Sequence, residues 1–220
     1  MTTDRDRALA LVTDSREIAP GIEPGIESRL DRFVALLLEW QKTTNLISPS
    51  TIPELWTRHV ADSLQLLKLA PGAKRWVDFG SGGGFPGIPI ACALTGREGA
   101  AVHLVESNHK KAAFLREAIR VTGAPARVHA RRVEDFVDGF AEPVEIVTAR
   151  ALAPLENLLA RAYPLLERGA QAMFLKGQDV VDDMREAARY WEYEADVIPS
   201  QSDGRGRIVR VRRLGRARKV

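Results

Sequence analysis

Five glycines lie within eight residues of this chain, between positions 80 and 87. The apolar segment 75–79 before them predicts a buried strand, and apolar residues at helical spacing follow them. A strand that turns through glycines into a helix brings backbone N–H groups beside the helix N-terminus, where a nucleotide-like ligand can approach. Glycine suits this turn because it permits positive φ and has no Cβ to hold a ligand away. The alternative interpretation is a glycine-rich surface turn that binds nothing.

The composition favours a folded α/β protein of one domain with an extension, or of two small domains. The chain has 220 residues, of which 45% are hydrophobic, and a formal net charge of +3. Its single cysteine, Cys92, lies on the apolar face of a predicted helix, so we expect a core residue in a reducing compartment. The charged N-terminus predicts no secretory signal, and no apolar run approaches the roughly 20 residues of a membrane span. We therefore expect a cytoplasmic protein.

Positive charge is unevenly distributed along the chain. Arginines gather at positions 127–132 and again between positions 205 and 218. Such a distribution permits a polyanionic partner such as RNA without requiring one, because charged runs are usually solvated surfaces.

Helical patterns precede the glycines. Residues 1–24 predict a mobile or partly helical arm, and apolar residues from Ile26 to Leu38 predict an amphipathic helix that ends near Lys42. Thr51, with Glu54 three residues later, resembles a capping box that would open a further helix. We therefore expect a helical cap over residues 1–72, before a second domain over residues 73–220.

Strand and helix patterns then alternate, which predicts a Rossmann-like α/β fold with a mostly parallel seven-stranded sheet. After the strand at 75–79, further strands are expected at 101–105, 126–130, 144–148 and 170–176, and helices at 108–122, 155–166 and 180–190. Ser107 is the expected N-cap of the helix at 108–122. The runs 191–198 and 207–212 have no helix between them and predict a C-terminal β-hairpin.

Glu106 ends the second predicted strand, where a carboxylate can accept hydrogen bonds from the hydroxyls of a ribose. The spacing from the glycines fits both NAD and S-adenosylmethionine, so this pair alone leaves the cofactor open. The chain has no second mononucleotide-binding half after the fourth strand, which disfavours NAD. By analogy of fold, a closing hairpin is typical of S-adenosylmethionine-dependent methyltransferases.

More specific motifs accompany the glycine turn. They are Trp40 with Asn45-Leu46, Arg58-His59 with Asp62-Ser63, Asp78-Phe79-Gly80-Ser81-Gly82 with Phe85-Pro86-Gly87-Ile88-Pro89, Val133-Glu134-Asp135-Phe136, Arg150-Ala151-Leu152 and Leu175-Lys176-Gly177-Gln178. With these motifs the chain closely resembles the bacterial 16S ribosomal RNA guanine-N7 methyltransferases, the glucose-inhibited division protein B family, from about Phe33 to Val211. Glu106 stands where some relatives have Asp, which preserves the carboxylate.

The resemblance implies a different role for each group of site residues. Implied contacts to S-adenosylmethionine, or to its product S-adenosylhomocysteine, fall at Asp78, Gly80, Ser81, Gly82, Phe85, Glu106, Val133, Glu134 and Arg150. Within this set the glycine turn and Phe85 would meet the methionine part, Glu106 the ribose, and Val133 and Glu134, in a loop after the third strand, the adenine. Arg150 is the implied catalytic residue. Implied contacts to substrate RNA fall at Asn45, His59, Arg132 and Lys176, and no metal site is expected.

Less specific interpretations remain for several of these residues. His59 is equally explained as a packed histidine, and Arg150 could pair with a helix carboxylate. Lys176 could extend its charge from a strand end into solvent. The tail arginines resemble the outward charges of an edge strand, and the same charges could hold RNA phosphates.

The implied reaction is transfer of a methyl group to N7 of a guanine in 16S ribosomal RNA, within the small subunit or an assembly intermediate. N7 has a free lone pair and no proton to lose, so in-line attack needs no general base. Alignment of the reactants then supplies most of the catalysis, up to about 7–11 kcal/mol. Methylation of cytosine C5 would need a nucleophilic thiol, and Cys92 is expected in the core. A nucleotide-dependent oxidoreductase and a non-catalytic RNA-binding assembly factor are the alternatives.

Overall fold

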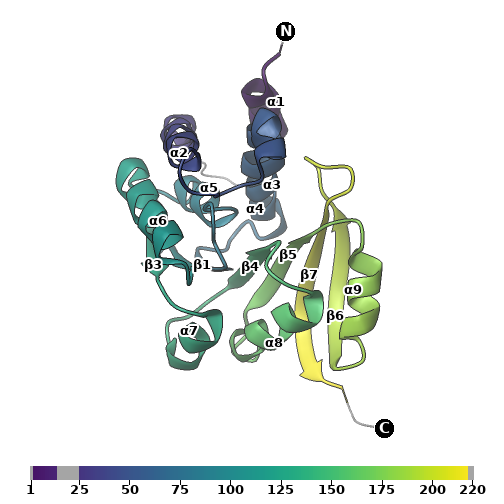
Figure 1. Ribbon diagram of the computed structural model, residues 1–220. Helices are drawn as coiled ribbons and strands as arrows, with labels where there is room; N and C mark the ends of the chain where they lie inside the picture. The colour runs from purple at the N-terminus through teal and green to yellow at the C-terminus, as the bar shows by residue number, and fades with distance from the viewer. Residues whose placement is uncertain (1, 14–24, 218–220) are drawn as a thin grey trace.

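The computed structural model describes residues 2–13 and 25–217, and the predicted Rossmann-like α/β fold is confirmed in it. Seven strands form one sheet in the order β3-β2-β1-β4-β5-β7-β6 (Figure 1). The strands are β1 (Arg75–Phe79), β2 (Ala101–Val105), β3 (Ala126–His129), β4 (Ile146–Arg150), β5 (Gln171–Lys176), β6 (Trp191–Pro199) and β7 (Arg207–Arg216).

The first five strands run parallel, and the closing hairpin adds two antiparallel strands. β1 lies between β2 and β4, with Asp78 opposite Leu104 on one side and Thr148 on the other. β7 pairs antiparallel with both β5 and β6. The carboxyl ends of β1, β2, β4 and β5 therefore meet at one edge of the sheet, next to the turn between β6 and β7. This edge is where ligands bind in open α/β sheets.

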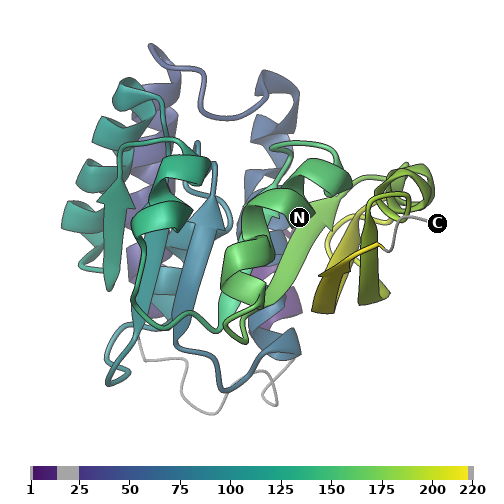
Figure 2. The ribbon, with the colours of Figure 1, turned by 90° about the horizontal axis from the view of Figure 1, so that it is seen from below.

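Helices cover both faces of the sheet (Figure 2). On one face lie α5 (Gly87–Ala93), α6 (His109–Thr122) and the helices that precede β1; on the other lie α7 (Val133–Gly139), α8 (Leu155–Leu166) and α9 (Val180–Ala187). Each face of the sheet has its own hydrophobic core, and alternate residues of β1 point to the two cores. Trp76 packs into the core on the side of α5 and α6, and Val77 into the core on the side of α7, α8 and α9. Cys92 of α5 is fully buried, as expected.

The segment before β1 is helical but less regular than its sequence predicts. It contains α1 (Asp4–Thr13), α2 (Ile26–Gln41), the 3-10 helix η1 (Pro49–Glu54), the π-helix η2 (Trp56–Ala61), α3 (Asp62–Leu64) and α4 (Leu66–Leu69). Part of the predicted arm, residues 14–24, lies outside the described residues. Thr51 lies inside η1 rather than at a helix N-cap, so the capping-box prediction is wrong. Its hydroxyl donates to the Ser48 carbonyl and also contacts His59.

Asp4 of α1 caps the π-helix in place of the predicted box. Its Oδ2 accepts from the backbone N–H of Trp56 at 2.8 Å and of Thr57 at 3.3 Å, and Oδ1 accepts from the Thr57 hydroxyl. A carboxylate there satisfies N–H groups that would otherwise lack partners. The N-terminal helix thereby anchors the segment that carries Arg58 and His59.

Further local predictions also differ from the structure. Asn108, not Ser107, is the N-cap of α6, because its Oδ1 accepts from the N–H groups of Lys110 and Lys111. Val133 and Glu134, expected in a loop, begin the helix α7, whose seven residues are too few to reveal a helical period. The helix at 180–190 ends three residues earlier than expected, at Ala187.

A pair of histidines links β2 to β3 and makes stability depend on pH. His103 Nδ1 and His129 Nε2 lie 3.0 Å apart. Burial lowers the pKa of His103 and lowers that of His129 to about 4, below the usual value of 6.5. Between pH 4 and pH 6.5 these histidines bind more protons in the unfolded chain than in the folded one. The stability that the neutral histidines contribute is therefore complete above about pH 6.5 and is lost as the pH falls towards 4.

We therefore expect the two histidines to lower the free energy of unfolding by about 1 kcal/mol or more between pH 7.5 and pH 5. Urea unfolding at the two pH values measures this change, and the variant His129→Gln should show a smaller one. An equally steep loss in the variant would assign the pH dependence to other groups.

Among the described residues, no helix is both long and apolar enough to cross a membrane.

Candidate active site

The glycine turn connects β1 to α5 and is closed by backbone hydrogen bonds. The N–H groups of Gly80 and Ser81 both donate to the Val105 carbonyl, at 2.8 and 3.1 Å. Gly80 and Gly82 have φ values of +65° and +50°, which glycine adopts without strain. A Cβ on Gly80 would lie 2.5 Å from Leu152 Cδ1, so no side chain fits between the turn and the segment after β4.

Glu106 is hydrogen-bonded to the glycine turn. Its Oε2 accepts from the Gly82 N–H at 2.9 Å, and its Oε1 accepts from the Asn108 N–H at 2.7 Å. The residue is 8% exposed, which fixes the carboxylate at the carboxyl end of β2. An ionised carboxylate offers about four lone-pair positions, so Glu106 retains capacity for the hydroxyls of a ribose.

Asp78 lies beneath the turn rather than on its surface. Its Oδ1 accepts from the Thr148 hydroxyl at 2.9 Å, and its Oδ2 is buried without a hydrogen-bond partner in the described chain. Burial raises the pKa of Asp78 to about 7, although hydrogen bonds from Ser81 and Thr148 oppose the shift. Asp78 therefore supports the turn from below, and its contact to the cofactor stays a prediction.

Arg150 ends β4, and its guanidinium lies over the ring of Phe85, which also packs against His59. Its guanidinium carbon lies 5.9 Å from the Phe85 ring centroid, and the His59 ring lies 5.0 Å from the same ring. Arg150 Nη1 is buried and has no hydrogen-bond partner within the described residues. Burial lowers the pKa of Arg150, and the charge of Asp62 opposes this shift. A buried donor without an acceptor marks a position where a ligand atom can bind.

The chain reverses sharply after Arg150. Ala151 has a φ of +48°, a left-handed conformation that non-glycine residues rarely adopt. The reversal places Leu152 against Gly80 while Arg150 stays at the end of its strand. Leu152 thus contacts the glycine turn, while Arg150 and Ala151 line a pocket.

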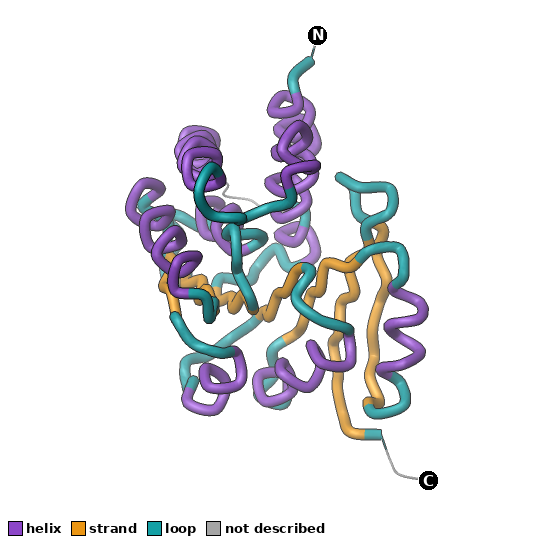
Figure 3. Tube along the Cα trace, in the orientation of Figure 1, coloured by secondary structure: helices purple, strands orange, loops and turns teal. Residues whose placement is uncertain are grey.

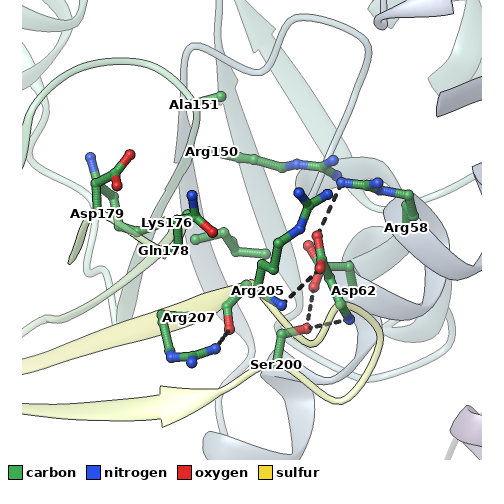
Figure 4. A pocket seen from close by; sticks show the side chains of 14 residues that line it. Arg58, Asp62, Arg150, Ala151, Lys176, Gln178, Asp179, Ser200, Arg205 and Arg207 are labelled. Carbon is green, nitrogen blue, oxygen red and sulfur yellow. Dashed lines mark hydrogen bonds and ion pairs between the residues drawn. The ribbon is translucent and has the colours of Figure 1, made fainter. Parts of the chain in front are cut away.

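That pocket has a volume of about 370 Å³ and lies between the ends of β4 and β5, the π-helix and the hairpin turn (Figure 4). Five of its side chains are cationic: Arg58, Arg150, Lys176, Arg205 and Arg207. Its size suits a small ligand, and its charge favours an anionic one.

Two of the cations in the pocket are already paired. Arg58 Nη2 donates to Asp203 Oδ2 at 3.0 Å. Lys176 lies 2.5 Å from Asp183 and donates to the Ala153 carbonyl at 3.0 Å. Lys176 therefore contributes charge to the pocket wall, with its ammonium group held by neighbours.

His59 is a neutral, packed side chain of the π-helix. Its Nε2 lies 2.8 Å from the Thr51 hydroxyl, while its Nδ1 is buried without a hydrogen-bond partner in the described chain. Burial, reinforced by the charges of Arg150 and Arg58, lowers the pKa of His59 to about 3. At neutral pH the ring therefore carries no charge.

The other residues implied by the resemblance lie around the same edge. Asn45 is exposed in a loop against the glycine turn, since a Cβ on Gly83 would lie 2.9 Å from the Leu46 carbonyl oxygen. Val133 and Glu134 form the first turn of α7 rather than a loop, and the Glu134 carboxylate pairs with Arg161 at 2.6 Å. Arg132 is exposed at the start of α7 and is not among the residues that line the pocket.

The sequence prediction of the site did not include the hairpin turn. Asp203 and Arg205 line the pocket but lie more than 50 residues after Arg150, and the sequence indicates only a turn and the start of a charged tail there. Arg58 and Asp62 belong to a motif that carries the resemblance. Their spacing of four residues on one helical segment indicates that the two side chains lie on the same face of the helix.

These residues fit S-adenosylmethionine. The glycine turn keeps side chains away from the carboxyl ends of β1 and β2, and Glu106 presents a fixed carboxylate beside it. Among the described residues, no group of three or more His, Cys, Asp or Glu is arranged to hold a metal ion.

Solved structures share this fold. The structure of cofactor-bound Rv0187 from MTB matches with a TM-score of 0.62 and 16% identity, over 96% of this chain and 98% of that one. An O-methyltransferase from Bacillus cereus in complex with SAH matches with a TM-score of 0.58 and 17% identity, over 96% and 98% of the two chains. At these identities the likeness establishes the fold alone.

Sequence comparisons are more specific. The Ribosomal RNA small subunit methyltransferase G of Bradyrhizobium sp. (strain BTAi1 / ATCC BAA-1182) is 57% identical over 96% of this chain and 91% of the relative. The protein of the same name from Rhodopseudomonas palustris (strain BisB18) is 56% identical over 95% and 86%. The family model GidB, described as rRNA small subunit methyltransferase G, matches residues 26–205. The chain belongs to the rRNA small subunit methyltransferase G family, whose members use S-adenosylmethionine.

Proposed function

We propose that this enzyme transfers a methyl group from S-adenosylmethionine to N7 of a guanine in 16S ribosomal RNA. The observation that carries the proposal is the position of Arg150, between the glycine turn and a cationic pocket and with an unpartnered buried donor. Family membership supplies the class of RNA. We further propose that the protein acts in the cytoplasm on the small ribosomal subunit or on an assembly intermediate.

The bound cofactor supplies an electrophilic methyl group on a sulfonium sulfur. The residues of this chain hold and orient the reactants: we assign the methionine part to Gly80, Ser81 and Gly82, the ribose to Glu106, and the adenine to the start of α7 at Val133. Phe85 and Arg150 form the wall between the cofactor and the acceptor base. The proposal divides the chain into a helical cap over residues 1–72 and a catalytic domain over residues 73–220.

The titratable groups near the site agree with a reaction that needs no proton transfer. His59 is neutral, with a pKa of about 3, and both neighbouring cations oppose its protonation. Burial raises the pKa of Cys92 to about 12, so this thiol cannot serve as the nucleophile of a cytosine-C5 methyltransferase. Guanine N7 needs neither group, because its lone pair attacks directly.

Arg205 is the best candidate for a contact to an RNA phosphate. It is exposed at the hairpin turn, and its guanidinium has no hydrogen-bond or ion-pair partner among residues 2–13 and 25–217. Figure 4 shows it extending towards Arg58 and Arg150. A phosphate at this position would be held next to the acceptor base and would relieve the repulsion among the three cations.

We expect Arg205→Ala to weaken binding of 16S ribosomal RNA about 3- to 10-fold and to reduce the slope of log affinity against log salt by about 0.7–0.9. Filter binding over a series of KCl concentrations measures both quantities. Arg213→Ala is the matched control, because Arg213 lies on the same hairpin with a side chain that is 86% exposed and is outside the pocket. Equal losses in the two variants would mean that Arg205 adds only general surface charge.

The proposal is tested with tritiated S-adenosylmethionine and four acceptors: small subunits, large subunits, naked 16S RNA and naked 23S RNA. We expect label in 16S RNA only. A non-catalytic assembly factor would bind 16S RNA and incorporate no label into any acceptor. An oxidoreductase would show binding of NAD, and not of S-adenosylhomocysteine, in a calorimetric titration.

A further inference from the structure

Asp62 lines the cationic pocket, and only one of its two carboxylate oxygens accepts hydrogen bonds from the described chain. Its Oδ1 accepts three hydrogen bonds: from Ser200 Oγ at 2.8 Å, Ser202 Oγ at 2.7 Å and Gln65 Nε2 at 2.6 Å. No hydrogen bond within the described chain reaches Oδ2. Three donors on one oxygen fix the carboxylate in a single orientation and tie the hairpin turn to the helices before β1.

Asp62 lines the same pocket as Arg150. Among the neighbouring charges, Asp62 contributes most to stabilising the charged form of Arg150. Asp62 lines the pocket and is 9% exposed, so its carboxylate is largely shielded from water. Asp62 and Arg150 therefore line the same pocket, one with a carboxylate oxygen and the other with a buried Nη1 that has no hydrogen-bond partner in the described chain.

The other carboxylates near the pocket are less suited to receive a ligand. Both oxygens of Asp203 are used, Oδ2 by Arg58 and Oδ1 by the Arg205 N–H at 2.9 Å. Asp183 is paired with Lys176. Asp179 is exposed to water, and Figure 4 shows it on the far side of Lys176 from Asp62.

We propose that Asp62 selects guanine as the acceptor base. Its Oδ2 accepts hydrogen bonds from N1–H and the 2-amino group, while Arg150 donates to O6. Guanine carries both donors on its Watson–Crick edge, and its O6 acceptor lies between that edge and N7. In this orientation N7 points past Arg150 towards the cofactor. Adenine has an acceptor at N1 and no 2-amino group, so its lone pair would face the carboxylate. This assignment rests on the proposed function and names the specificity residue of the same site.

The same carboxylate assists the transfer electrostatically. The N7 lone pair forms the new N–CH₃ bond while the S–CH₃ bond breaks, so positive charge passes from sulfur to the purine. A fixed negative charge at the opposite edge of the base stabilises the cationic product and the transition state that leads to it. Asp62 is therefore expected to affect turnover as well as the choice of base.

The test compares guanosine with inosine at the modified position. Inosine keeps N7, O6 and N1–H but lacks the 2-amino group. Full-length 16S RNA carrying either nucleoside is prepared by splinted ligation, and single-turnover methylation is measured. We expect the wild-type enzyme to prefer guanosine by about 10- to 100-fold, because inosine lacks one of the two hydrogen bonds that guanosine donates to the charged acceptor. Asp62→Asn should reduce this preference to within about 3-fold.

Asn is a matched substitution, because its side-chain oxygen still accepts the three hydrogen bonds that hold the hairpin. Asp203→Asn and Ser202→Ala are the controls: each disturbs the turn, leaves Asp62 Oδ2 intact, and should keep the preference for guanosine. If Asp62→Asn turns over too slowly, the same ratio is read from the affinities of the two RNAs for the S-adenosylhomocysteine-bound protein.

Equal use of guanosine and inosine by the wild-type enzyme would overturn the assignment, as would an unchanged preference in Asp62→Asn. Loss of the preference in Asp203→Asn alone would move the specificity role to the hairpin and also contradict it. Failure of the wild-type enzyme to methylate the guanosine RNA is a different result, since it would refute the proposed function itself.

Discussion

Replacement of Glu106 by alanine is expected to weaken binding of S-adenosylhomocysteine at least about 100-fold. The substitution removes the proposed contact to the ribose and also the acceptor for the N–H groups of Gly82 and Asn108, at 2.9 and 2.7 Å. Each hydrogen bond to a charged group contributes about 1.5–3 kcal/mol, so the loss of two or more exceeds a factor of 100. Calorimetric titration of the purified variant with S-adenosylhomocysteine measures the effect.

Two further variants separate the carboxylate from the shape of the side chain. Glu106→Asp keeps the charge and should lose about 10-fold or less, whereas Glu106→Gln places an amide group against backbone donors and should resemble alanine. A variant Glu106→Ala that binds S-adenosylhomocysteine as tightly as the wild type would remove this residue from the cofactor site.

Arg150→Ala is expected to lower kcat about 100- to 1000-fold while cofactor affinity changes by less than about 5-fold. The guanidinium borders both reactants, and loss of one well-placed donor at a reacting centre costs about this much in turnover. Folding should change little, because burial disfavours the charged form of Arg150 and lowers its pKa. Single-turnover methylation, calorimetry and thermal unfolding of the variant measure the three quantities.

Arg150→Lys is expected to recover only part of the activity, since an ammonium group cannot reproduce the planar geometry of a guanidinium. Arg185→Ala, on the exposed face of α9, is the control and should behave as the wild type. Unchanged turnover in Arg150→Ala would exclude Arg150 from the reaction.

The parts of the site that depend on neighbouring residues could be predicted from the sequence. The glycine turn is one, because strand, glycines and helix follow each other directly between positions 75 and 93. Glu106 is another, because the carboxylate ends the next strand of a parallel series. Both predictions rest on backbone order, which a sequence shows explicitly.

The pocket could not be predicted in the same way, because its walls come from distant segments. Asp62 and Ser200 are hydrogen-bonded across 138 positions, and Arg58 and Asp203 across 145. Figure 3 shows that the loops at this edge come from several strand ends and from the hairpin. No periodicity in the sequence records such contacts.

The errors in local structure have similar causes. Thr51 and Glu54 fit a capping pattern, but the carboxylate of Asp4, about 50 positions earlier, caps the π-helix instead. Val133 begins a helix of seven residues that is held by Phe136 and Val137 packing into the core, not by a visible period. Tertiary contacts decided both outcomes.

The most direct test of the proposed chemistry is the identity of the methylated nucleoside. Small ribosomal subunits are incubated with the enzyme and labelled S-adenosylmethionine, and the 16S RNA is digested to nucleosides and separated. The account predicts that all enzyme-dependent label elutes as 7-methylguanosine, and that Arg150→Ala reduces this label at least about 100-fold. Label in any other nucleoside, or equal label from the Arg150→Ala variant, would contradict it.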